Sequence, residues 1–415
     1  MSTPLVNDAK RRIEQVRKKD VRLRVTQNGQ PVEGAQVNLQ MRRHDYLFGA
    51  VCYAYGKFAD PAQNERFTQL FTPLFNYTMM PVHWDWYEPK RHEYNEPYVG
   101  NLVDWAEQHN IARKMHALIW HECCPEWVTD GMDIKGLYEE RINTLLTRYT
   151  GRFDFYDLIN ESTVSDRFDN PVSRWMAEYG QVNVARFGEQ LVRAIEPDAK
   201  LIYGDWNVHG QDYLDFLRDL READIGLDAI GLQSHQHRDI WTQEETLRVM
   251  DEAAKFGWPL HFPEVSVCSG KPIGEMSYLP GAINHFSETE EDLYWQADFT
   301  KDFYTLVFSH PATEAISWFD FVDHRWLGAP AGVVTDDLQI KPIYRMLMDL
   351  LHKEWRSEAQ LTTTSEGICG ARVFFGEYEA AITVNGQTVT RQFVLKRPSF
   401  YEGGGEPELI EIALD

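Results

Sequence analysis

The feature that most constrains the fold is an alternation, between residues 46 and 353, of short apolar segments with longer amphipathic ones. A short apolar segment fits a buried strand, and an amphipathic stretch of about ten or more residues fits a helix that covers it. The apolar segments lie at 46–52, 77–84, 112–120, 153–159, 199–206, 227–235, 259–267 and 315–321. The amphipathic stretches that follow them lie at 61–73, 97–109, 133–149, 172–195, 211–222, 243–256, 289–309 and 340–353. Eight consecutive pairs predict an α/β fold, a closed (β/α)8 TIM barrel, over a doubly wound open sheet, which is the competing arrangement.

Both ends of the chain change to an alternation with a period of two residues, which is typical of antiparallel strands. This pattern covers residues 21–43 and 368–397, and each stretch contains an Asn-Gly turn that favours a hairpin. Because a lone hairpin is only marginally stable in water, we expect both ends to combine into one small accessory β-sandwich. The predicted regions are a lead-in with accessory strands at 1–44, the barrel at 45–354, and accessory strands with a tail at 355–415.

The charge of the chain disfavours several classes of partner. Of its 415 residues, 41 are Lys or Arg and 64 are Asp or Glu, which gives a formal net charge of −23. Such a chain repels phosphate backbones and anionic lipid headgroups, so neither nucleic acid nor a membrane is an expected partner. The sequence also contains no apolar run of about 18 residues that would span a bilayer.

The ends and the cysteines give further expectations. The first twenty residues lack the apolar core of a signal peptide, so we expect a protein that is cytoplasmic as written, or secreted with its leader removed. Residues 10–20 are predicted to be helical, and the glycine-rich stretch Glu402–Glu406 is expected to be a flexible tail. Five cysteines, two of them adjacent, fit reduced thiols better than a disulfide framework. The oligomeric state stays open.

Polar and aromatic side chains gather at the predicted strand ends, where barrels of this kind carry their active sites. Two of these residues are glutamates, Glu161 after the fourth apolar segment and Glu264 within the seventh. Strands four and seven of an eight-stranded barrel lie on roughly opposite sides of its mouth. Two carboxylates that face each other, one protonated and one ionised, are what glycoside hydrolysis needs. The alternative is that both glutamates are solvated loop residues.

The histidines and tryptophans at the strand ends support a sugar site. His235 lies two residues after Gln233, so both side chains point the same way, and a histidine there can keep a carboxylate ionised by hydrogen bonding. A metal site is disfavoured because the segment after His121 departs from the H-E-x-x-H spacing, and we expect neither a metal nor another cofactor. Tryptophans at strand ends favour stacking on sugar faces, although each could also be a core residue; they include Trp84, Trp120, Trp318 and Trp326.

Several spaced motifs resemble glycoside hydrolase family 10, the β-1,4-xylanases whose catalytic carboxylates follow barrel strands four and seven. HALIWH at 116–121 resembles the family's H-T-L-V-W-H, and YDLINE at 156–161 resembles its acid/base motif W-D-V-V-N-E. GLQSH at 231–235 is identical to the family's G-L-Q-S-H. FPEV at 262–265 stands where the nucleophile motif I-T-E-L belongs, and KPIY at 341–344 resembles K-P-A-Y. The resemblance covers about residues 45–353.

The resemblance implies a retaining glycoside hydrolase that cleaves β-1,4-xylosidic bonds in xylan or xylo-oligosaccharides. It implies Glu161 as the acid/base and Glu264 as the nucleophile, with Asn160 and His235 in support. The residues implied to bind the substrate are His83, Trp84, His116, Trp120, Gln233, Trp318 and Trp326.

The chain departs from the family after the second strand. The family has E-N-x-M-K-W there, polar groups that clamp sugars distant from the cut, whereas this chain has Met79 to Trp84 with His83 in place of the lysine. We therefore expect weaker hydrogen bonding at the distal sugars, and a pH dependence near the ordinary histidine pKa of about 6.5. Two alternatives stay open: action on another β-glycan or transglycosylation, and a catalytically silent barrel that binds carbohydrate or inhibits another hydrolase.

Overall fold

The computed structural model describes residues 3–237, 240–279 and 281–414, and these form two compact units. One unit comprises Phe48–Thr300 and Ala315–Tyr344, and the other comprises Met1–Leu47, Lys301–Glu314 and Arg345–Asp415. No helix in the described ranges is both long and apolar enough to cross a bilayer.

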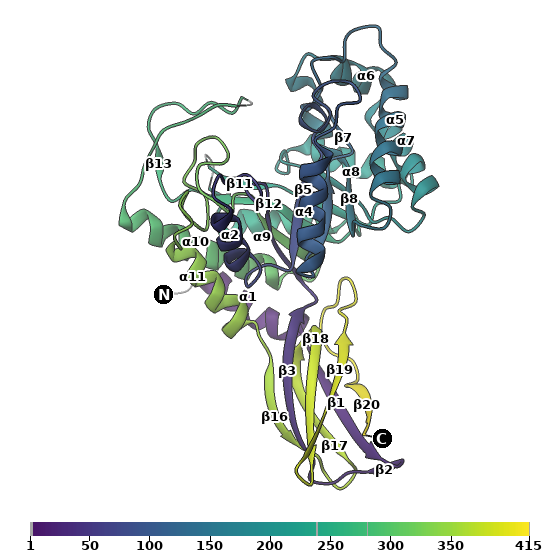
Figure 1. Cartoon of the computed structure of the whole chain (residues 1–415), viewed down its shortest axis with the longest axis vertical. Coiled ribbons are helices and arrows are strands. Elements are labelled where there is room, and N and C mark those ends of the chain that lie inside the picture. The colour runs from purple at the N-terminus through teal and green to yellow at the C-terminus, as the bar shows by residue number, and fades with distance from the viewer. Residues whose placement is uncertain (1–2, 238–239, 280, 415) are drawn as a thin grey trace. The chain divides into compact units, whose positions relative to one another are not determined.

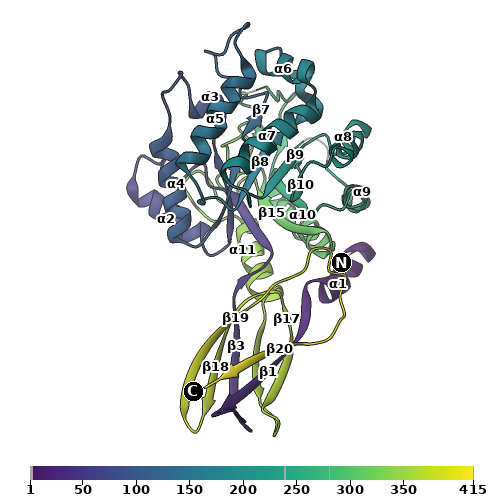
Figure 2. The same cartoon turned by 90° about the vertical axis from the view of Figure 1, so that its right-hand side faces the viewer.

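The larger unit is built on a closed ring of parallel strands, with helices around the outside (Figures 1 and 2). Within the described residues the ring runs in the order β10, β9, β8, β6, β5, β4, β15 and β12, and β12 pairs with β10 to close it. The strands are β4 (Leu47–Val51), β5 (Tyr77–Pro81), β6 (Ala112–His116), β8 (Phe155–Asn160), β9 (Leu201–Asp205), β10 (Ala229–Leu232), β12 (Leu260–Val267) and β15 (Thr313–Trp318). Two short strands, β7 (Ile119–Trp120) and β11 (Ser234–Gln236), extend the ring beside β8 and β12. The predicted barrel is confirmed.

The helices lie where the amphipathic stretches predicted them, except that one predicted helix is divided into two. They are α2 (Pro61–Phe71), α4 (Glu96–Gln108), α5 (Ile134–Arg148), α6 (Pro171–Tyr179), α7 (Gln181–Ile195), α8 (Gln211–Glu222), α9 (Gln243–Ala254), α10 (Glu290–Ser309) and α11 (Pro342–Asp349). The single helix predicted over 172–195 is two helices, because Gly180 between them has a φ of 88° that an α-helix does not accommodate. Shorter helical turns are α3 (Trp84–Tyr87), η1 (Ser162–Arg167) and η2 (Leu350–Glu354).

The local sequence explains these elements. Helix α9 begins at a capping box in which Thr242 and Glu245 satisfy each other's free backbone N–H groups. Helix α8 buries Tyr213, Phe216 and Leu217 on one face. All residues of β5 and β12 are buried, as expected for parallel strands covered on both sides. The polar residues that these strands contain must therefore find partners inside the barrel.

The smaller unit contains helix α1 (Pro4–Val16) and two sheets from both ends of the chain. One sheet holds β1 (Lys18–Gln27), β2 (Gln30–Pro31), β17 (Ile368–Phe374) and β20 (Glu408–Ala413), and the other holds β3 (Gln36–His44), β16 (Glu358–Thr362), β18 (Gly376–Val384) and β19 (Gln387–Leu395). In Figure 1, β3, β18 and β19 lie side by side. Accessory strands from both termini were predicted, but β20 was not: it follows the glycine-rich stretch and pairs in parallel with β1.

Candidate active site

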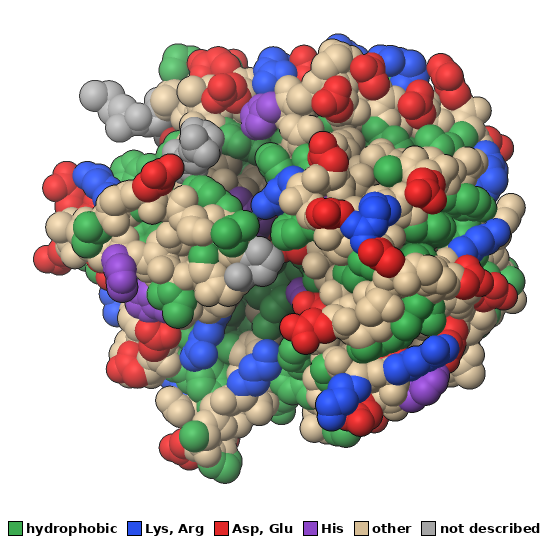
Figure 3. All heavy atoms as spheres, turned by 90° about the horizontal axis from the view of Figure 1, so that it is seen from above, with side chains coloured by type: hydrophobic (Ala, Val, Ile, Leu, Met, Phe, Trp, Pro, Cys, Tyr) green, Lys and Arg blue, Asp and Glu red, His purple; other side chains and the backbone are tan. Residues whose placement is uncertain are grey.

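Buried polar residues lie at the ends of β6, β8 and β9 and within β12, among them His116, Asn160, Asp205 and Glu264. The face of the molecule seen in Figure 3 is hollowed near its centre, and histidine and hydrophobic side chains are visible within the hollow. Acidic and basic side chains surround it. The two glutamates predicted at the strand ends, Glu161 and Glu264, are each only 5% exposed, so neither is a solvated loop residue.

Glu161 directly follows β8 and has an unusual backbone conformation. Its φ of 57° and ψ of 40° are left-handed, which costs a residue other than glycine roughly 1–2 kcal/mol. Its N–H donates to the carbonyl of Gly204 at 2.7 Å. Asn160 Nδ2 and Gln233 Nε2 donate to Glu161 Oε1 at 3.2 and 3.1 Å. Two neutral amides, one from the last residue of β8 and one from the residue between β10 (Ala229–Leu232) and β11 (Ser234–Gln236), thus orient one oxygen of this carboxyl group.

The surroundings of Glu161 favour its protonated form. Burial raises its pKa well above the ordinary value, and the charges of Glu122, Glu264 and Asp205 raise it further. The hydrogen bond from Gln233 opposes this but does not outweigh it. A carboxyl group that keeps its proton near neutral pH can act as a general acid.

Glu264 lies within β12, and imidazoles contact it. His235 Nε2 is 3.0 Å from Glu264 Oε2, and His116 Nε2 is 3.9 Å from Glu264 Oε1. His116 is in turn held by Asp157, whose Oδ2 lies 2.6 Å from His116 Nδ1 and 2.6 Å from Lys114 Nζ. Burial alone would raise the pKa of Asp157, but Lys114 and His116 outweigh it and the pKa is lowered. Asp157 is therefore an anion that orients His116 toward Glu264.

The four tryptophans predicted to bind the substrate fall into two groups. Trp120 and Trp326 are half-buried, and Trp326 packs against His235 with ring centroids 4.4 Å apart. Trp84 and Trp318 are 2% and 0% exposed, and their indole N–H groups donate to Glu88 and to the carbonyl of Ala331. The predicted stacking of these two on a sugar does not fit this burial, because neither ring has an exposed face. They pack in the core beneath the site.

His83 lies among the aromatic rings of the site. Its ring centroid is 5.4 Å from His116, 5.3 Å from Trp120 and 6.0 Å from Tyr53. Its buried Nε2 has no hydrogen-bond partner among the described residues. The expected pH dependence near 6.5 is wrong, because burial and the nearby His116 lower the pKa of His83 well below its ordinary value. A buried, neutral and unpartnered nitrogen here is available to a ligand.

Sequence reasoning missed several charged residues of the site, of which Glu122 matters most. Its Oε2 lies 4.0 Å from Nη1 of Arg167, and its charge is the largest electrostatic influence on Glu161 after burial. The sequence signal was a carboxylate next to His121 at a strand end. The guanidinium of Arg167 in turn lies 5.3 Å from the ring centroid of Trp206, which is 40% exposed.

Lys114 and Asp157 were also missed. Lys114 lies in the middle of the predicted third strand and Asp157 in the fourth, and this position is the signal that could have paired them, since a buried charge needs a partner. No three His, Cys, Asp or Glu side chains form a group that could hold a metal, as far as the described ranges extend.

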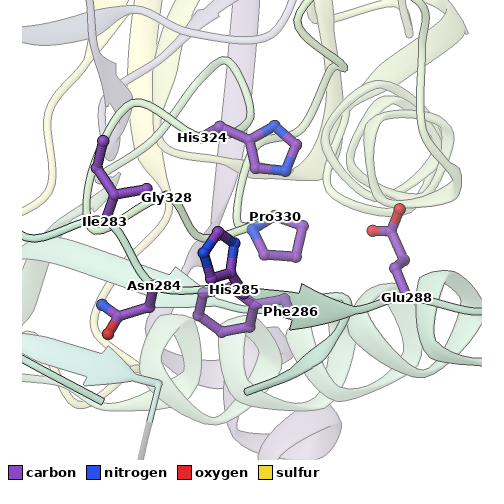
Figure 4. A pocket seen from close by; sticks show the side chains of 8 residues that line it. All are labelled: Ile283, Asn284, His285, Phe286, Glu288, His324, Gly328 and Pro330. Atoms are coloured by element: carbon purple, nitrogen blue, oxygen red, sulfur yellow. The ribbon is translucent and has the colours of Figure 1, made fainter. Parts of the chain in front are cut away.

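A separate cavity of about 360 Å³ lies between the loop that follows β12 and the loop that follows β15 (Figure 4). His285, His324 and Glu288 face it over Phe286 and Pro330. The amide N–H of Asn284 donates to the carbonyl of Leu327 at 2.9 Å, which ties the two loops together. No motif in the sequence predicted this cavity.

Comparison with known proteins assigns the family. Glycosyl hydrolase family 10 matches residues 42–350, most of the chain. The chain therefore belongs to glycosyl hydrolase family 10, as the motifs predicted. Among solved structures, native xylanase 10B from Thermotoga maritima is 22% identical with a TM-score of 0.61, over 75% of this chain and 96% of that one. Xylanase 10B from Thermotoga petrophila in complex with xylobiose is 21% identical, also with a TM-score of 0.61, over 75% of this chain and 95% of that one.

Curated relatives are similarly distant. Endo-1,4-beta-xylanase B from Thermotoga neapolitana is 24% identical over 65% of this chain and 78% of its own length. The anti-sigma-I factor RsgI6 of Acetivibrio thermocellus is 23% identical over 92% of this chain, and endo-1,4-beta-xylanase 1 of Arabidopsis thaliana is 22% identical over 94%. This chain spans only 47% and 39% of the length of the last two proteins.

Proposed function

We propose that this protein is a retaining glycoside hydrolase that cleaves β-1,4-xylosidic bonds in xylan or xylo-oligosaccharides. Membership of glycosyl hydrolase family 10 supports hydrolysis of a glycoside. The substrate class is supported by relatives named endo-1,4-beta-xylanases and by a similar structure that holds xylobiose.

The observation that carries the proposal is the contrast between the two buried glutamates. Glu161 has neutral amides and further carboxylates around it, so its pKa is raised and it holds a proton. Glu264 has the ring nitrogens of His235 and His116 beside its two oxygens, and an imidazole N–H there can donate to them. A protonated acid paired with a second buried carboxyl group is what glycoside hydrolysis requires, and membership of family 10 supports double displacement by that pair.

In the first step, a carboxylate oxygen of Glu264 forms a bond to the anomeric carbon while the glycosidic C–O bond breaks. The proton of Glu161 moves to the departing oxygen, so the leaving sugar departs as a neutral alcohol. In the second step, Glu161, now a carboxylate, takes a proton from water as the water oxygen attacks the anomeric carbon. The bond to Glu264 then breaks, and two inversions give net retention.

Asn160 and Gln233 are placed to act beside Glu161. We expect Asn160 to hydrogen-bond the 2-hydroxyl of the sugar at the cut, a contact that strengthens in the transition state. Gln233 Nε2 lies 3.4 Å from Asn160 Oδ1, so it can fix the orientation of this amide. Trp120 and Trp326 are the predicted tryptophans with exposed surface, and the ring stacking that we propose is assigned to them.

The experiment is a product analysis on arabinoxylan, glucuronoxylan, xylohexaose and β-glucan, with proton NMR of the first product formed from xylohexaose. The proposal predicts xylo-oligosaccharide products and a β-configured anomeric centre at early times. Cleavage of β-glucan alone would move the substrate to another β-glycan, and an α-configured first product would refute the retaining mechanism. Absence of any hydrolysis would favour a silent carbohydrate-binding barrel.

A further inference from the structure

A line of four hydrogen-bonded side chains, His235, Ser266, His237 and Cys268, extends from Glu264. His235 Nε2 lies 3.0 Å from Glu264 Oε2, and His235 Nδ1 lies 2.9 Å from Ser266 Oγ. Ser266 Oγ is 3.4 Å from His237 Nε2, and His237 Nδ1 is 2.9 Å from Cys268 Sγ. His235 lies in β11 and His237 directly follows that strand, whereas Ser266 lies in β12 and Cys268 directly follows it. Residues two apart on a strand face the same way, so the two pairs of side chains meet between the strands.

The far end of this line determines which atom donates in each contact. Burial raises the pKa of the Cys268 thiol to about 12, so the sulfur carries its hydrogen and donates to His237 Nδ1. Burial lowers the pKa of His237 to about 3, so this ring is neutral. With Nδ1 accepting, the single N–H of His237 is at Nε2 and points to Ser266 Oγ.

The hydrogen positions of Ser266 and His235 follow from that of His237. Ser266 accepts from His237 and has one hydrogen left, which it donates to His235 Nδ1. His235 Nδ1 therefore carries no proton, and the hydrogen of this ring is at Nε2, facing Glu264 Oε2. The reverse direction would need an acceptor at the end of the line, and a buried thiol with its proton attached is a poor one.

The line is enclosed by apolar and aromatic groups. Trp326 covers both histidines, with ring centroids 4.4 Å from His235 and 4.6 Å from His237. Phe319 meets the His235 ring edge-on at 4.9 Å. Ser266, His237 and Cys268 are 0%, 7% and 6% exposed, so bulk water does not compete for these hydrogen bonds.

We propose that Ser266, His237 and Cys268 are positioning residues that hold His235 neutral, with its proton on Nε2, and so fix the donor to Glu264. The proposal rests on the proposed function in one respect, the role of Glu264 as nucleophile. With its ring hydrogen on Nε2, His235 donates to Glu264 Oε2, whereas the other neutral tautomer would face this carboxyl group with a lone pair. The donor is also in place before each turnover and needs no rearrangement during it.

The test is NMR of the full-length protein with 15N-labelled histidine at neutral pH, because two-bond couplings show which ring nitrogen carries the proton. The His235 signal is assigned by its loss in His235→Gln. The wild type should show Nε2 protonated and Nδ1 unprotonated. A doubly protonated His235, or one protonated at Nδ1, overturns the proposal.

A matched pair of variants tests the far end. Cys268→Ala removes the last donor, so His235 should become a mixture of tautomers and kcat should fall about fivefold, the size expected for one lost hydrogen bond, with KM unchanged. Cys268→Ser keeps a donor and should restore the Nε2 tautomer and most of kcat. Cys369→Ala, a buried thiol in β17 of the smaller unit, serves as the control for loss of a thiol. If Cys268→Ala keeps the wild-type tautomer and kcat, Cys268 has no such role.

The two proposals fail in different ways. If Glu264→Ala retained hydrolysis, the proposed nucleophile would be wrong, whereas the tautomer of His235 would still be read directly by NMR. If Glu264→Ala is inactive but His235 carries its proton on Nδ1, the nucleophile stands and the positioning line is refuted.

Discussion

Glu161 and Glu264 are glutamates of equal burial in one barrel, yet their immediate neighbours differ in kind. The carboxyl group of Glu161 is held by the amides of Asn160 and Gln233, with other carboxylates nearby. The carboxyl group of Glu264 lies between two imidazoles. Equal burial does not by itself distinguish the two carboxyl groups, whereas the charge and donor capacity of their neighbours do.

The largest expected effect comes from removing Glu264, the glutamate next to the two imidazoles. Glu264→Ala should lower kcat on xylan on the order of 10⁵-fold, because no covalent intermediate can form. Added azide should restore turnover of an activated aryl xyloside with inversion, since it attacks from the vacated side. Azide products of retained configuration would exchange the roles of the two glutamates.

Removing Glu161, the glutamate next to the two amides, should lower kcat by less, and by an amount that depends on the substrate. Glu161→Ala should lower kcat on xylan by roughly 10²- to 10⁴-fold, the usual contribution of a general acid. The first step on an aryl xyloside with a good leaving group should be spared, because such a group departs without a proton. An equal loss on both substrates, measured in the pre-steady state, would contradict the acid role.

Replacing His83, which lies next to His116, tests the effect of a positive charge near Glu264 on substrate binding. His83→Lys supplies the ammonium that the family has at this place and should lower KM for xylotetraose and longer chains about fivefold, the value of one added hydrogen bond. A short aryl xyloside, which does not reach distal sugars, serves as the control. If kcat/KM for the longer chains is unchanged and a ligand complex shows His83 away from the sugar, the residue is structural.

Replacing Glu122 tests how a neighbouring charge affects the pKa of Glu161, which is measured through the pH dependence of activity. Its charge raises the pKa of Glu161, and the other charges acting on that carboxyl group are those of Glu264 and Asp205. Glu122→Gln should therefore lower the pKa of Glu161. Because the protonated form is the active acid, the alkaline limb of kcat/KM should move to lower pH. A limb that stays in place, with Glu122→Asp as the charge-preserving control, would show that Glu122 does not act on the acid.

The sequence predicted the barrel because the alternation of strand and helix repeats over about 300 residues. The break of one helix at Gly180 does not hide a pattern that recurs so often. The strand ends predicted Glu161 and Glu264 because strand position alone places them in the mouth. The family assignment is confirmed, whereas the catalytic and substrate-binding roles remain predictions.

Other features depend on three-dimensional packing that the sequence does not display. Trp84 and Trp120 are both at strand ends, but the direction of each side chain decides that one is core and the other half-buried. The neutral state of His83 follows from burial between rings of three separate segments. The line from His235 to Cys268 needs the register of β11 against β12, which pairs His235 with Ser266 and Gln236 with Val267.

The most direct test of the central claim is covalent trapping with an activated 2-deoxy-2-fluoro xylobioside, followed by mass spectrometry of the proteolysed protein. Fluorine at carbon 2 destabilises the oxocarbenium-like transition states, and the good leaving group keeps the first step the faster one, so the intermediate accumulates. The account predicts one glycosyl group per chain, attached to Glu264, and the same attachment in Glu161→Ala. A label on Glu161, or complete absence of a covalent adduct in an enzyme that hydrolyses xylan, would contradict it.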